Sequence, residues 1–183
     1  MSNGKGTRWN LYQGITKQES LINGERLLDR TVRQIKERTN DKIIIFSCNE
    51  NHVNNNSTRL VPSSKDHFKK LLGYEFIDEP VTYLYGDTYY PDETIEQIIN
   101  DDCKDIAFYG DENAIVGIKA VNFELLKQVL DQDNDPKTNV YHICDSIMDK
   151  RKFVIVTHGY TNINTPEDYI KLVDRTRNRT KEW

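Results

Sequence analysis

The 183-residue sequence has few cysteines, and their positions exclude two common small-protein frameworks. Cys48, Cys103 and Cys144 are odd in number and scattered, with no Cys-x-x-Cys spacing, so the sequence predicts neither a disulfide scaffold nor a zinc ribbon. The four histidines are equally dispersed and form no zinc-binding pattern with the cysteines. This cysteine usage is typical of a reduced, cytoplasmic protein, and we expect that location.

Long apolar runs and an excess of positive charge are also missing. The longest uninterrupted apolar stretches have the length of short strands, and the start of the sequence lacks the apolar core of a signal peptide. The formal net charge of −4 argues against a basic face for nucleic acid or a membrane surface. We therefore expect no nucleic-acid partner and no membrane partner, and favour a protein that handles small metabolites.

Short apolar runs alternate with amphipathic segments along the chain. The runs at 42–47, 81–85 and 152–157 predict buried strands, and further strands joined by a turn are expected at 105–109 and 114–120. Helices are expected at 25–38 with Asn23 as the cap, at 64–72, at 91–100, after Asn122, at 140–148 and after Thr165. The alternation predicts an α/β fold: a three-layer α/β/α arrangement with a mostly parallel (mixed) sheet, in which residues 1–183 form a single domain.

Two polar segments interrupt this pattern. The Asn-rich segment 49–57 is too long for a tight turn, so it is either a mobile surface excursion or part of a site. The charged segment 175–183 is expected to fray at the end of the last helix.

A glycine-rich stretch near the N-terminus carries the first candidate binding residues. It consists of Gly4, Lys5, Gly6, Thr7 and Arg8, and Lys17 follows after a short gap. Two glycines one residue apart let backbone N–H groups approach an anion, because no Cβ keeps a phosphate away. Arg8 adds a planar fork of donors, and Lys17 adds a compact charge that we expect to be solvated without a ligand. The residues alone also fit a flexible N-terminal tail.

The order of these parts carries a resemblance to a known family. The glycine-rich stretch, the pair Lys17-Gln18 and the segment that starts with Asn23-Gly24 resemble the N-terminal signature of nucleotidyltransferases with a GT-A-like fold. This family includes sugar-phosphate nucleotidyltransferases and cytidylyltransferases. The resemblance implies that residues 4–8 and Lys17 bind the triphosphate of an incoming nucleotide, with Arg8 and Lys17 as the catalytic cations.

Two further stretches extend the resemblance over most of the chain. The stretch 84–90, where the strand at 81–85 ends in Gly86-Asp87, is similar to the family's strand that ends in Gly-Asp and whose Asp binds Mg²⁺. The segment 162–168 is similar to the family's Asp-Thr-Pro-Glu-Asp-Leu motif, with Asn164 at the leading position that completes the metal site. The resemblance therefore implies a magnesium cofactor held by Asp87 and Asn164. On residues alone, Asp87 also fits a turn after a strand, and Asn164 also fits a helix start.

The resemblance implies a reaction and its partners. A nucleoside triphosphate would transfer NMP to a sugar phosphate or a similar phosphorylated small molecule, and pyrophosphate would leave. Two other functions stay open: a GT-A-type glycosyltransferase that uses a sugar nucleotide, and a catalytically silent nucleotide-binding or structural module. The sequence leaves self-association into a homo-oligomer open as well.

One feature departs from the family pattern. Members carry a buried strand of about five residues directly before the glycine-rich loop. Here only Met1-Ser2-Asn3 stands there, so the N-terminal strand is shortened or missing in residues 1–183. Three explanations follow from this departure: a shortened start, a strand supplied by another chain, or nucleotide binding without turnover.

Overall fold

The computed structural model describes residues 8–64, 67–132, 140–147 and 151–179. Its largest sheet has the strand order β5 (Val81–Leu84), β8 (Ile115–Ala120), β7 (Ile106–Gly110) and β9 (Arg151–Ile155). Strand β7 runs parallel to β9, whereas β8 runs antiparallel to both β5 and β7. Three of these four strands therefore share one direction, which confirms the predicted mixed sheet.

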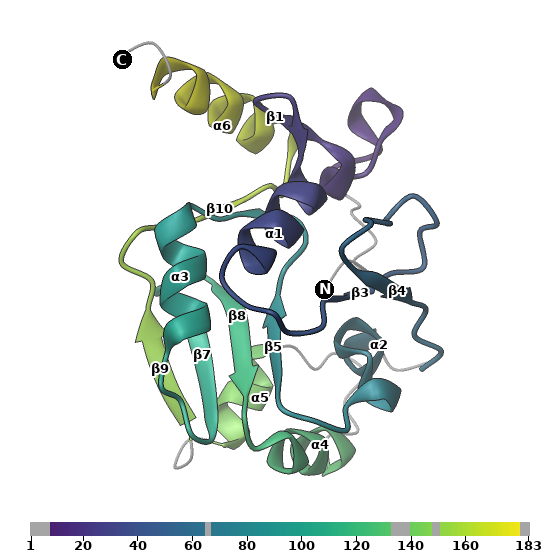
Figure 1. Cartoon of the computed structure of the whole chain (residues 1–183), viewed down its shortest axis with the longest axis vertical. Coiled ribbons are helices and arrows are strands. Elements are labelled where there is room, and N and C mark those ends of the chain that lie inside the picture. Colours follow the sequence, from purple (N-terminus) through teal and green to yellow (C-terminus); the bar gives the residue numbers. More distant parts are fainter. Residues whose placement is uncertain (1–7, 65–66, 133–139, 148–150, 180–183) are drawn as a thin grey trace.

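The remaining described strands form three small pairs. They are the antiparallel pair β1 (Leu21–Ile22) and β2 (Glu25–Arg26), the parallel pair β3 (Ile44–Phe46) and β4 (Thr58–Leu60), and the antiparallel pair β6 (Thr88–Tyr89) and β10 (Thr161–Asn162). Figure 1 shows β3 and β4 beside β5 but outside the four-stranded sheet.

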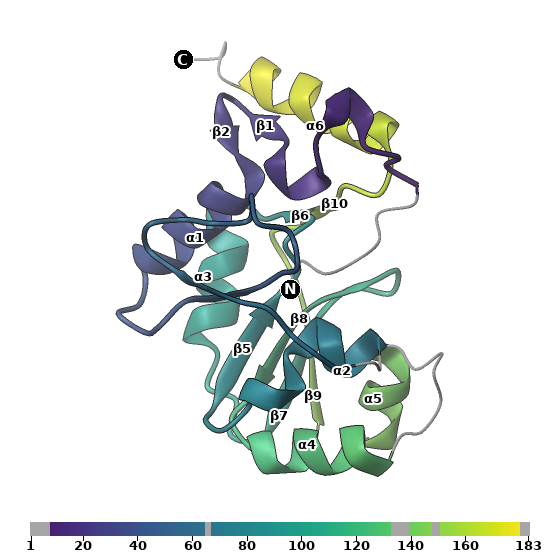
Figure 2. The same cartoon turned by 90° about the vertical axis from the view of Figure 1, so that its right-hand side faces the viewer.

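Helices cover both faces of the main sheet. The α-helices are α1 (Leu27–Lys36), α2 (His67–Leu72), α3 (Asp92–Asn100), α4 (Phe123–Gln132), α5 (Val140–Ser146) and α6 (Pro166–Arg179). Short 3₁₀ turns occur at Tyr12–Gly14, Lys17–Glu19 and Tyr74–Phe76. Helix α3 lies on one face of the sheet, and α4 and α5 lie on the other (Figures 1 and 2). Within the described residues, no helix combines the length and apolar character needed to cross a membrane.

Strand β7 explains why the fold has three layers. Its residues alternate between the two faces, as a strand requires. Ile106 and Phe108 pack in the cluster that contains Leu126 of α4. Ala107 and Tyr109 pack in the cluster that contains Ile95 and Ile98 of α3. Every residue of β7 is buried, so the predicted three-layer α/β/α fold is confirmed.

The start of the first helix differs from the prediction. Asn23 does not cap α1; it forms the turn of the β1–β2 hairpin with Gly24. Both residues have positive φ, 52° for Asn23 and 82° for Gly24. An Asn-Gly pair suits such a two-residue turn, because both residues tolerate the left-handed region. Helix α1 therefore begins only at Leu27.

The last strand is also less buried than predicted. Strand β9 lies at the edge of the sheet, and Phe153 and Ile155 are 41% and 56% exposed. Phe153 pairs in register with Phe108 of β7, and among the described strands β9 has a partner on one side only. Val154 faces the α3 side and packs there. The apolar run predicted the strand correctly, and its place at the edge of the sheet accounts for its exposure.

Two predicted helix starts are confirmed, and one predicted helix end is wrong. The Asn122 side chain accepts a hydrogen bond from the Leu125 amide (3.1 Å) at the start of α4. Thr165 and Asp168 form reciprocal hydrogen bonds at the start of α6, from the Thr165 amide to Asp168 (2.9 Å) and from the Asp168 amide to Thr165 (3.2 Å). Helix α6 continues through the charged segment to Arg179 instead of fraying from Arg175.

Candidate active site at the end of strand β5

The site is built on the turn that follows β5. This turn carries Asp87 between β5 and β6. The Tyr90 side chain, only 1% exposed, fixes the turn from inside. Its hydroxyl accepts a hydrogen bond from the Tyr85 amide (2.9 Å) and donates to the Val116 carbonyl (2.7 Å). The position of Asp87 is therefore set by the core of the sheet.

A long-range strand pair brings Asn164 beside Asp87. Strand β6 pairs with β10, and the Ile163 amide donates to the Asp87 carbonyl (2.9 Å). The Thr88 hydroxyl donates to the Asn162 side chain (2.6 Å). Asn164 follows directly, and its amide donates to the Asp168 carboxylate (3.1 Å) at the start of α6. The structure thus places Asp87 and Asn164 together, as the sequence predicted.

Lys17 reaches the same turn from the N-terminal segment. Its Nζ lies 2.9 Å from Asp87 Oδ2, and its side chain is only 9% exposed. The short turn that carries Lys17 is held by Glu19, whose carboxylate accepts from the Thr16 amide (3.0 Å) and hydroxyl (2.6 Å). The expectation that Lys17 is solvated without a ligand is therefore wrong, because Asp87 already serves as its partner.

Arg8 completes the group from an exposed position. Its Nη2 donates to Asn164 Oδ1 over 3.2 Å. The neighbouring Trp9 anchors this segment: it is 2% exposed, its Nε1 donates to the Ile15 carbonyl (2.7 Å), and its ring meets that of Tyr169 edge-on. Helix α6 and the N-terminal segment therefore pack on each other and hold Arg8 over Asn164.

The structure brings together four of the predicted site residues. They are Arg8, Lys17, Asp87 and Asn164. The other four, Gly4, Lys5, Gly6 and Thr7, lie outside the described residues. Arg8 contacts Asn164 and Lys17 contacts Asp87, so each proposed cation lies beside one proposed metal ligand. Such a group can bind phosphate through Arg8 and Lys17, while its oxygens suit a hard divalent cation.

The oxygens of Asp87 and Asn164 fit a Mg²⁺ site in which substrate phosphates supply further ligands. Magnesium in nucleotide sites is held by one or two carboxylates together with phosphate oxygens. Asp87 supplies one carboxylate and Asn164 one neutral amide oxygen. No group of three or more His, Cys, Asp or Glu side chains suited to a metal occurs among the described residues. A metal here would therefore depend on oxygens from the nucleotide.

A buried histidine, missed from the sequence, supports the loop that carries Lys17. His52 is 2% exposed, with its Nδ1 2.7 Å from the Ser47 hydroxyl and its Nε2 2.8 Å from the Thr16 hydroxyl. Nε2 also lies 3.3 Å from the Asn49 side-chain nitrogen, and the Thr16 hydroxyl donates to the Glu19 carboxylate. Burial lowers the pKa of His52, although the nearby Glu19 carboxylate opposes the shift. His52 thus links the end of β3 to the Lys17 turn.

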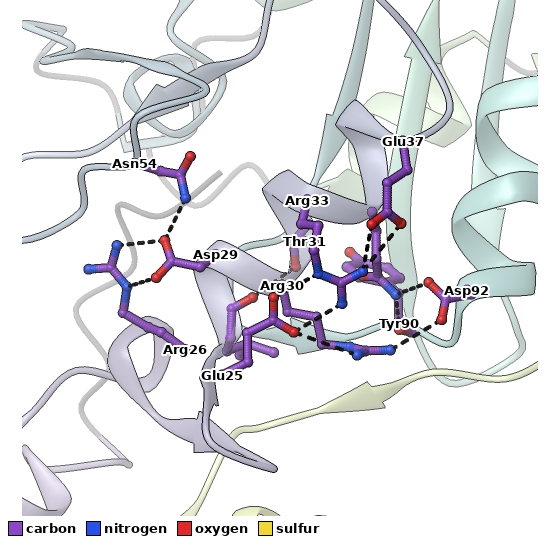
Figure 3. Close-up of polar contacts among 12 residues, drawn as sticks. Glu25, Arg26, Asp29, Arg30, Thr31, Arg33, Glu37, Asn54, Tyr90 and Asp92 are labelled. Atoms are coloured by element: carbon purple, nitrogen blue, oxygen red, sulfur yellow. Dashed lines mark hydrogen bonds and ion pairs between the residues drawn. The ribbon is translucent and has the colours of Figure 1, made fainter.

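An ionic network on α1 fixes the polar segment 49–57 (Figure 3). Arg26 forms two hydrogen bonds with the Asp29 carboxylate, of 2.7 and 2.8 Å, and also donates to the carbonyls of Asn51 and Val53. Asn54 donates to the same carboxylate over 2.7 Å. Hydrogen bonding to Arg26 and Asn54 lowers the pKa of Asp29, although burial alone would raise it. These contacts join the segment to Arg26 and Asp29, and His52 joins it to Thr16 beside Lys17. That the segment is part of a site stays a prediction.

The other half of this network holds α1 to α3. Arg33 pairs with Glu25 (2.8 Å) and with Glu37 (3.0 Å), and Arg30 lies 3.6 Å from the Asp92 carboxylate (Figure 3). Arg38 also lies 3.6 Å from that carboxylate. The buried Gln34 amide donates to the Tyr90 carbonyl over 3.0 Å. This contact reaches the tyrosine that fixes the Asp87 turn. The arginines of α1 are therefore structural in this arrangement.

Comparison with known proteins gives matches in structure alone. No protein-family model matches the sequence, and no curated protein matches it. A solved nucleotidyl transferase from Methanothermobacter thermautotrophicus superposes with a TM-score of 0.72 at 16% identity, covering 97% of this chain and 95% of that one. The similarity therefore extends over nearly the full length of both chains.

Two cytidylyltransferases show the same likeness. The CTP:phosphocholine cytidylyltransferase of Streptococcus pneumoniae has a TM-score of 0.63 at 14% identity, covering 94% of this chain and 95% of that one. The inositol-1-phosphate CTP transferase of T. maritima has a TM-score of 0.63 at 11% identity, covering 96% and 93%. At these identities the comparison establishes the fold. The chain has the fold of the nucleotidyltransferases that its sequence motifs resemble.

Proposed function

We propose that this protein is a magnesium-dependent nucleotidyltransferase. It transfers NMP from a nucleoside triphosphate to a sugar phosphate or a similar phosphorylated small molecule. The observation that carries the proposal is the grouping of Arg8, Lys17, Asp87 and Asn164 at one edge of a fold shared with solved nucleotidyltransferases. These residues come from widely separated parts of the sequence.

The protein's part in the reaction is to position phosphates and offset their charge. A phosphate oxygen of the acceptor attacks the α-phosphorus of the nucleotide, and a new P–O bond forms. The bond from the α-phosphorus to the bridging oxygen breaks, and its electron pair leaves with pyrophosphate. Arg8 donates to phosphate oxygens from its exposed position, and Lys17 places a charge on the triphosphate when it turns from Asp87. Chemistry of this type depends mainly on such cations and on alignment.

Asp87 has a second partner in the loaded enzyme. Its carboxylate and the Asn164 amide oxygen would hold Mg²⁺, which when bound offsets the negative charge of the phosphate oxygens. Since Lys17 contacts Asp87 Oδ2 without ligand, Lys17 would leave Asp87 when it binds phosphate. Lys17 would then pair with phosphate and Asp87 with the metal, so neither charge would lack a partner of opposite sign.

The glycosyltransferase alternative is less well supported by the turn itself. Such enzymes commonly carry a second aspartate two positions after the first. Here that position is Tyr89, and the intervening Thr88 is 1% exposed and bonded to Asn162. Asp87 is therefore the only carboxylate in the segment 87–89.

Pyrophosphate release tests the proposal against both alternatives. The protein is incubated with Mg²⁺, each of the four ribonucleoside triphosphates and a panel of phosphorylated sugars and alcohols. Acceptor-dependent pyrophosphate release supports the proposal. Sugar transfer or hydrolysis from a sugar nucleotide, without pyrophosphate release, would favour the glycosyltransferase. Nucleotide binding without either reaction would favour the silent module.

A further inference from the structure

The backbone of the Lys17 turn is fixed by the residues at its two ends. Lys17 belongs to the short 3₁₀ turn Lys17–Glu19, which Thr16 precedes. The Glu19 carboxylate accepts from the Thr16 amide (3.0 Å) and hydroxyl (2.6 Å), and the Glu19 amide donates to the Thr16 carbonyl (3.1 Å). This reciprocal arrangement is a capping box, which fixes where a helical turn begins. The turn therefore presents the Lys17 side chain from a defined position.

A histidine from the polar segment 49–57 holds this capping box from outside. His52 Nε2 lies 2.8 Å from the Thr16 hydroxyl, the same group that donates to Glu19. On its other side, His52 Nδ1 lies 2.7 Å from the hydroxyl of Ser47, which directly follows β3. The imidazole thus bridges the capping box and the end of a strand.

Burial makes this bridge costly to break. The residue exposures of His52 and Ser47 are 2% and 0%, so water has little access to the hydrogen bonds between them. Removing one partner of a buried hydrogen bond leaves the other unsatisfied, which costs more than the bond itself contributes. The Asn51 side chain adds a hydrogen bond to the Glu19 carboxylate. The polar segment therefore restrains the Lys17 turn at two points.

The two halves of the Lys17–Asp87 pair are held by different parts of the molecule. Lys17 Nζ lies 2.9 Å from Asp87 Oδ2. The Asp87 turn is fixed from the core of the sheet by Tyr90, whereas the Lys17 turn is fixed through His52. The lysine side chain is a flexible four-carbon stem, so its amine can change partners while its backbone stays in place.

We propose that His52 is a positioning residue for triphosphate binding, which holds the Lys17 turn in place while the Lys17 side chain exchanges Asp87 for phosphate. This inference rests on the proposed function, in which Lys17 binds the triphosphate. His52 acts through Thr16 and makes no contact with the phosphate or the metal. Because a small misplacement of a binding group weakens its interactions steeply, loss of the bridge lowers affinity even with Lys17 unchanged.

The test measures the dissociation constants of the four ribonucleoside triphosphates, each with Mg²⁺, by calorimetric titration. Thr16→Val removes the hydroxyl that joins His52 to Glu19 with little change of shape, whereas Thr16→Ser retains a hydroxyl. We expect Thr16→Val and His52→Ala each to weaken binding about tenfold, and Thr16→Ser to bind like wild type. Ile143→Val, in the core cluster that contains Phe108 of β7, is a matched control that lowers stability away from the turn and should leave the affinity unchanged.

The same substitutions in a Lys17→Met background separate positioning from a general effect on the fold. If His52 acts through Lys17, Thr16→Val and His52→Ala should cause no further loss of triphosphate affinity there, although each still lowers Tm. Equal losses of affinity in both backgrounds would overturn the proposal, because the bridge would then act through other contacts. Since Thr16→Val is nearly isosteric, it decides the question if His52→Ala does not fold.

The outcomes also distinguish this inference from the proposed function. If the wild-type protein binds a triphosphate and releases pyrophosphate, while Thr16→Val and His52→Ala bind as tightly as wild type, the inference is overturned and the proposed function stands. If Lys17→Met retains wild-type affinity, Lys17 is not a phosphate ligand and the inference fails with its premise. If the wild-type protein binds none of the four triphosphates, both are overturned.

Discussion

Lys17 and Asp87 are 70 residues apart in the sequence, and their side chains meet at 2.9 Å in the centre of the candidate site. The lysine is 9% exposed and the aspartate 29% exposed, so this ion pair is only partly screened by solvent. The pair neutralises the positive group that we propose for phosphate binding. It also ties the N-terminal segment to the end of β5, which couples folding of the loop to the geometry of the site.

The first prediction concerns this pair. Lys17→Met should remove most triphosphate affinity and also lower the free energy of unfolding by about 1–2 kcal/mol, because Asp87 loses its partner but stays partly solvated. Urea denaturation and nucleotide titration measure the two effects. Lys171→Met, on the exposed face of α6, is the surface control and should change neither.

A double-mutant cycle with Asp87→Asn isolates the pair from other effects. The double variant Lys17→Met/Asp87→Asn should be less destabilised than the sum of the single variants, because no charge is then left unpaired. Strictly additive changes in the free energy of unfolding would show that the two charges do not interact in solution.

The second prediction concerns Arg8. Since its side chain is exposed, Arg8→Ala should leave Tm within about 1–2 °C of wild type while lowering the rate of pyrophosphate release on the order of 10²-fold. Arg8→Lys keeps the charge but loses the planar fork, and should recover only part of the rate. Full activity in Arg8→Ala would remove Arg8 from the phosphate-binding group.

The third prediction concerns magnesium and the contrast between Asp87 and Asn164. Mg²⁺ should bind weakly to the protein alone and more tightly in the presence of a triphosphate, because the nucleotide supplies oxygen ligands. Asp87→Asn should abolish the tight phase with the fold intact, whereas Asn164→Asp should strengthen binding by adding a carboxylate. Calorimetric titration of the three proteins, with and without nucleotide, measures this. The same Mg²⁺ affinity in all three would exclude the pair as metal ligands.

The fourth prediction concerns pH and His52. Its pKa in the folded protein is lowered from the ordinary 6.5, so the unfolded chain binds a proton more readily than the folded one. The stability that neutral His52 provides is therefore complete above pH 6.5 and decreases as the pH falls below that value, by up to about 1.4 kcal/mol per pH unit. Urea denaturation between pH 5 and pH 8 should show this slope.

Two variants test whether His52 causes this pH dependence of the free energy of unfolding. In His52→Gln the part of the slope due to this histidine should disappear, at the cost of lower stability at pH 7 because Ser47 and Thr16 lose their common partner. In His158→Gln, where the side chain is exposed, the slope should persist. If the His52→Gln protein retains the wild-type slope, another group causes it.

Local patterns predicted the elements of this fold well, because strand and helix periodicity depends on neighbouring residues. The run at 105–109 predicted β7, and the caps at Asn122 and Thr165 predicted the starts of α4 and α6. The juxtaposition of Asp87 and Asn164 was also predicted, since it followed from the resemblance together with the expected topology. Their roles as metal ligands stay a prediction.

The features that the sequence did not predict depend on contacts between segments that are far apart in the sequence. The exposure of Phe153 follows from the edge position of β9, which no local pattern encodes. Lys17 is buried because Asp87, which is distant in the sequence, contacts it. The role of His52 depends on its contact with the Lys17 turn, which no local pattern predicts. The hairpin at Asn23 was different, because the Asn-Gly pair between Ile22 and Glu25 was a local signal that favoured a turn over a helix cap.

The packing of Trp9 against Tyr169 has a consequence for how the protein is made. During synthesis the N-terminal segment emerges first, yet the surface that anchors it belongs to α6, which emerges more than a hundred residues later. Arg8 and Lys17 therefore leave the ribosome long before Asn164 and the helix that orders them. At about 5–20 residues per second, this interval lasts on the order of ten seconds. A nascent chain stalled before Pro166 should consequently leave Trp9 accessible to solvent, and nucleotide binding should first appear once α6 has been released.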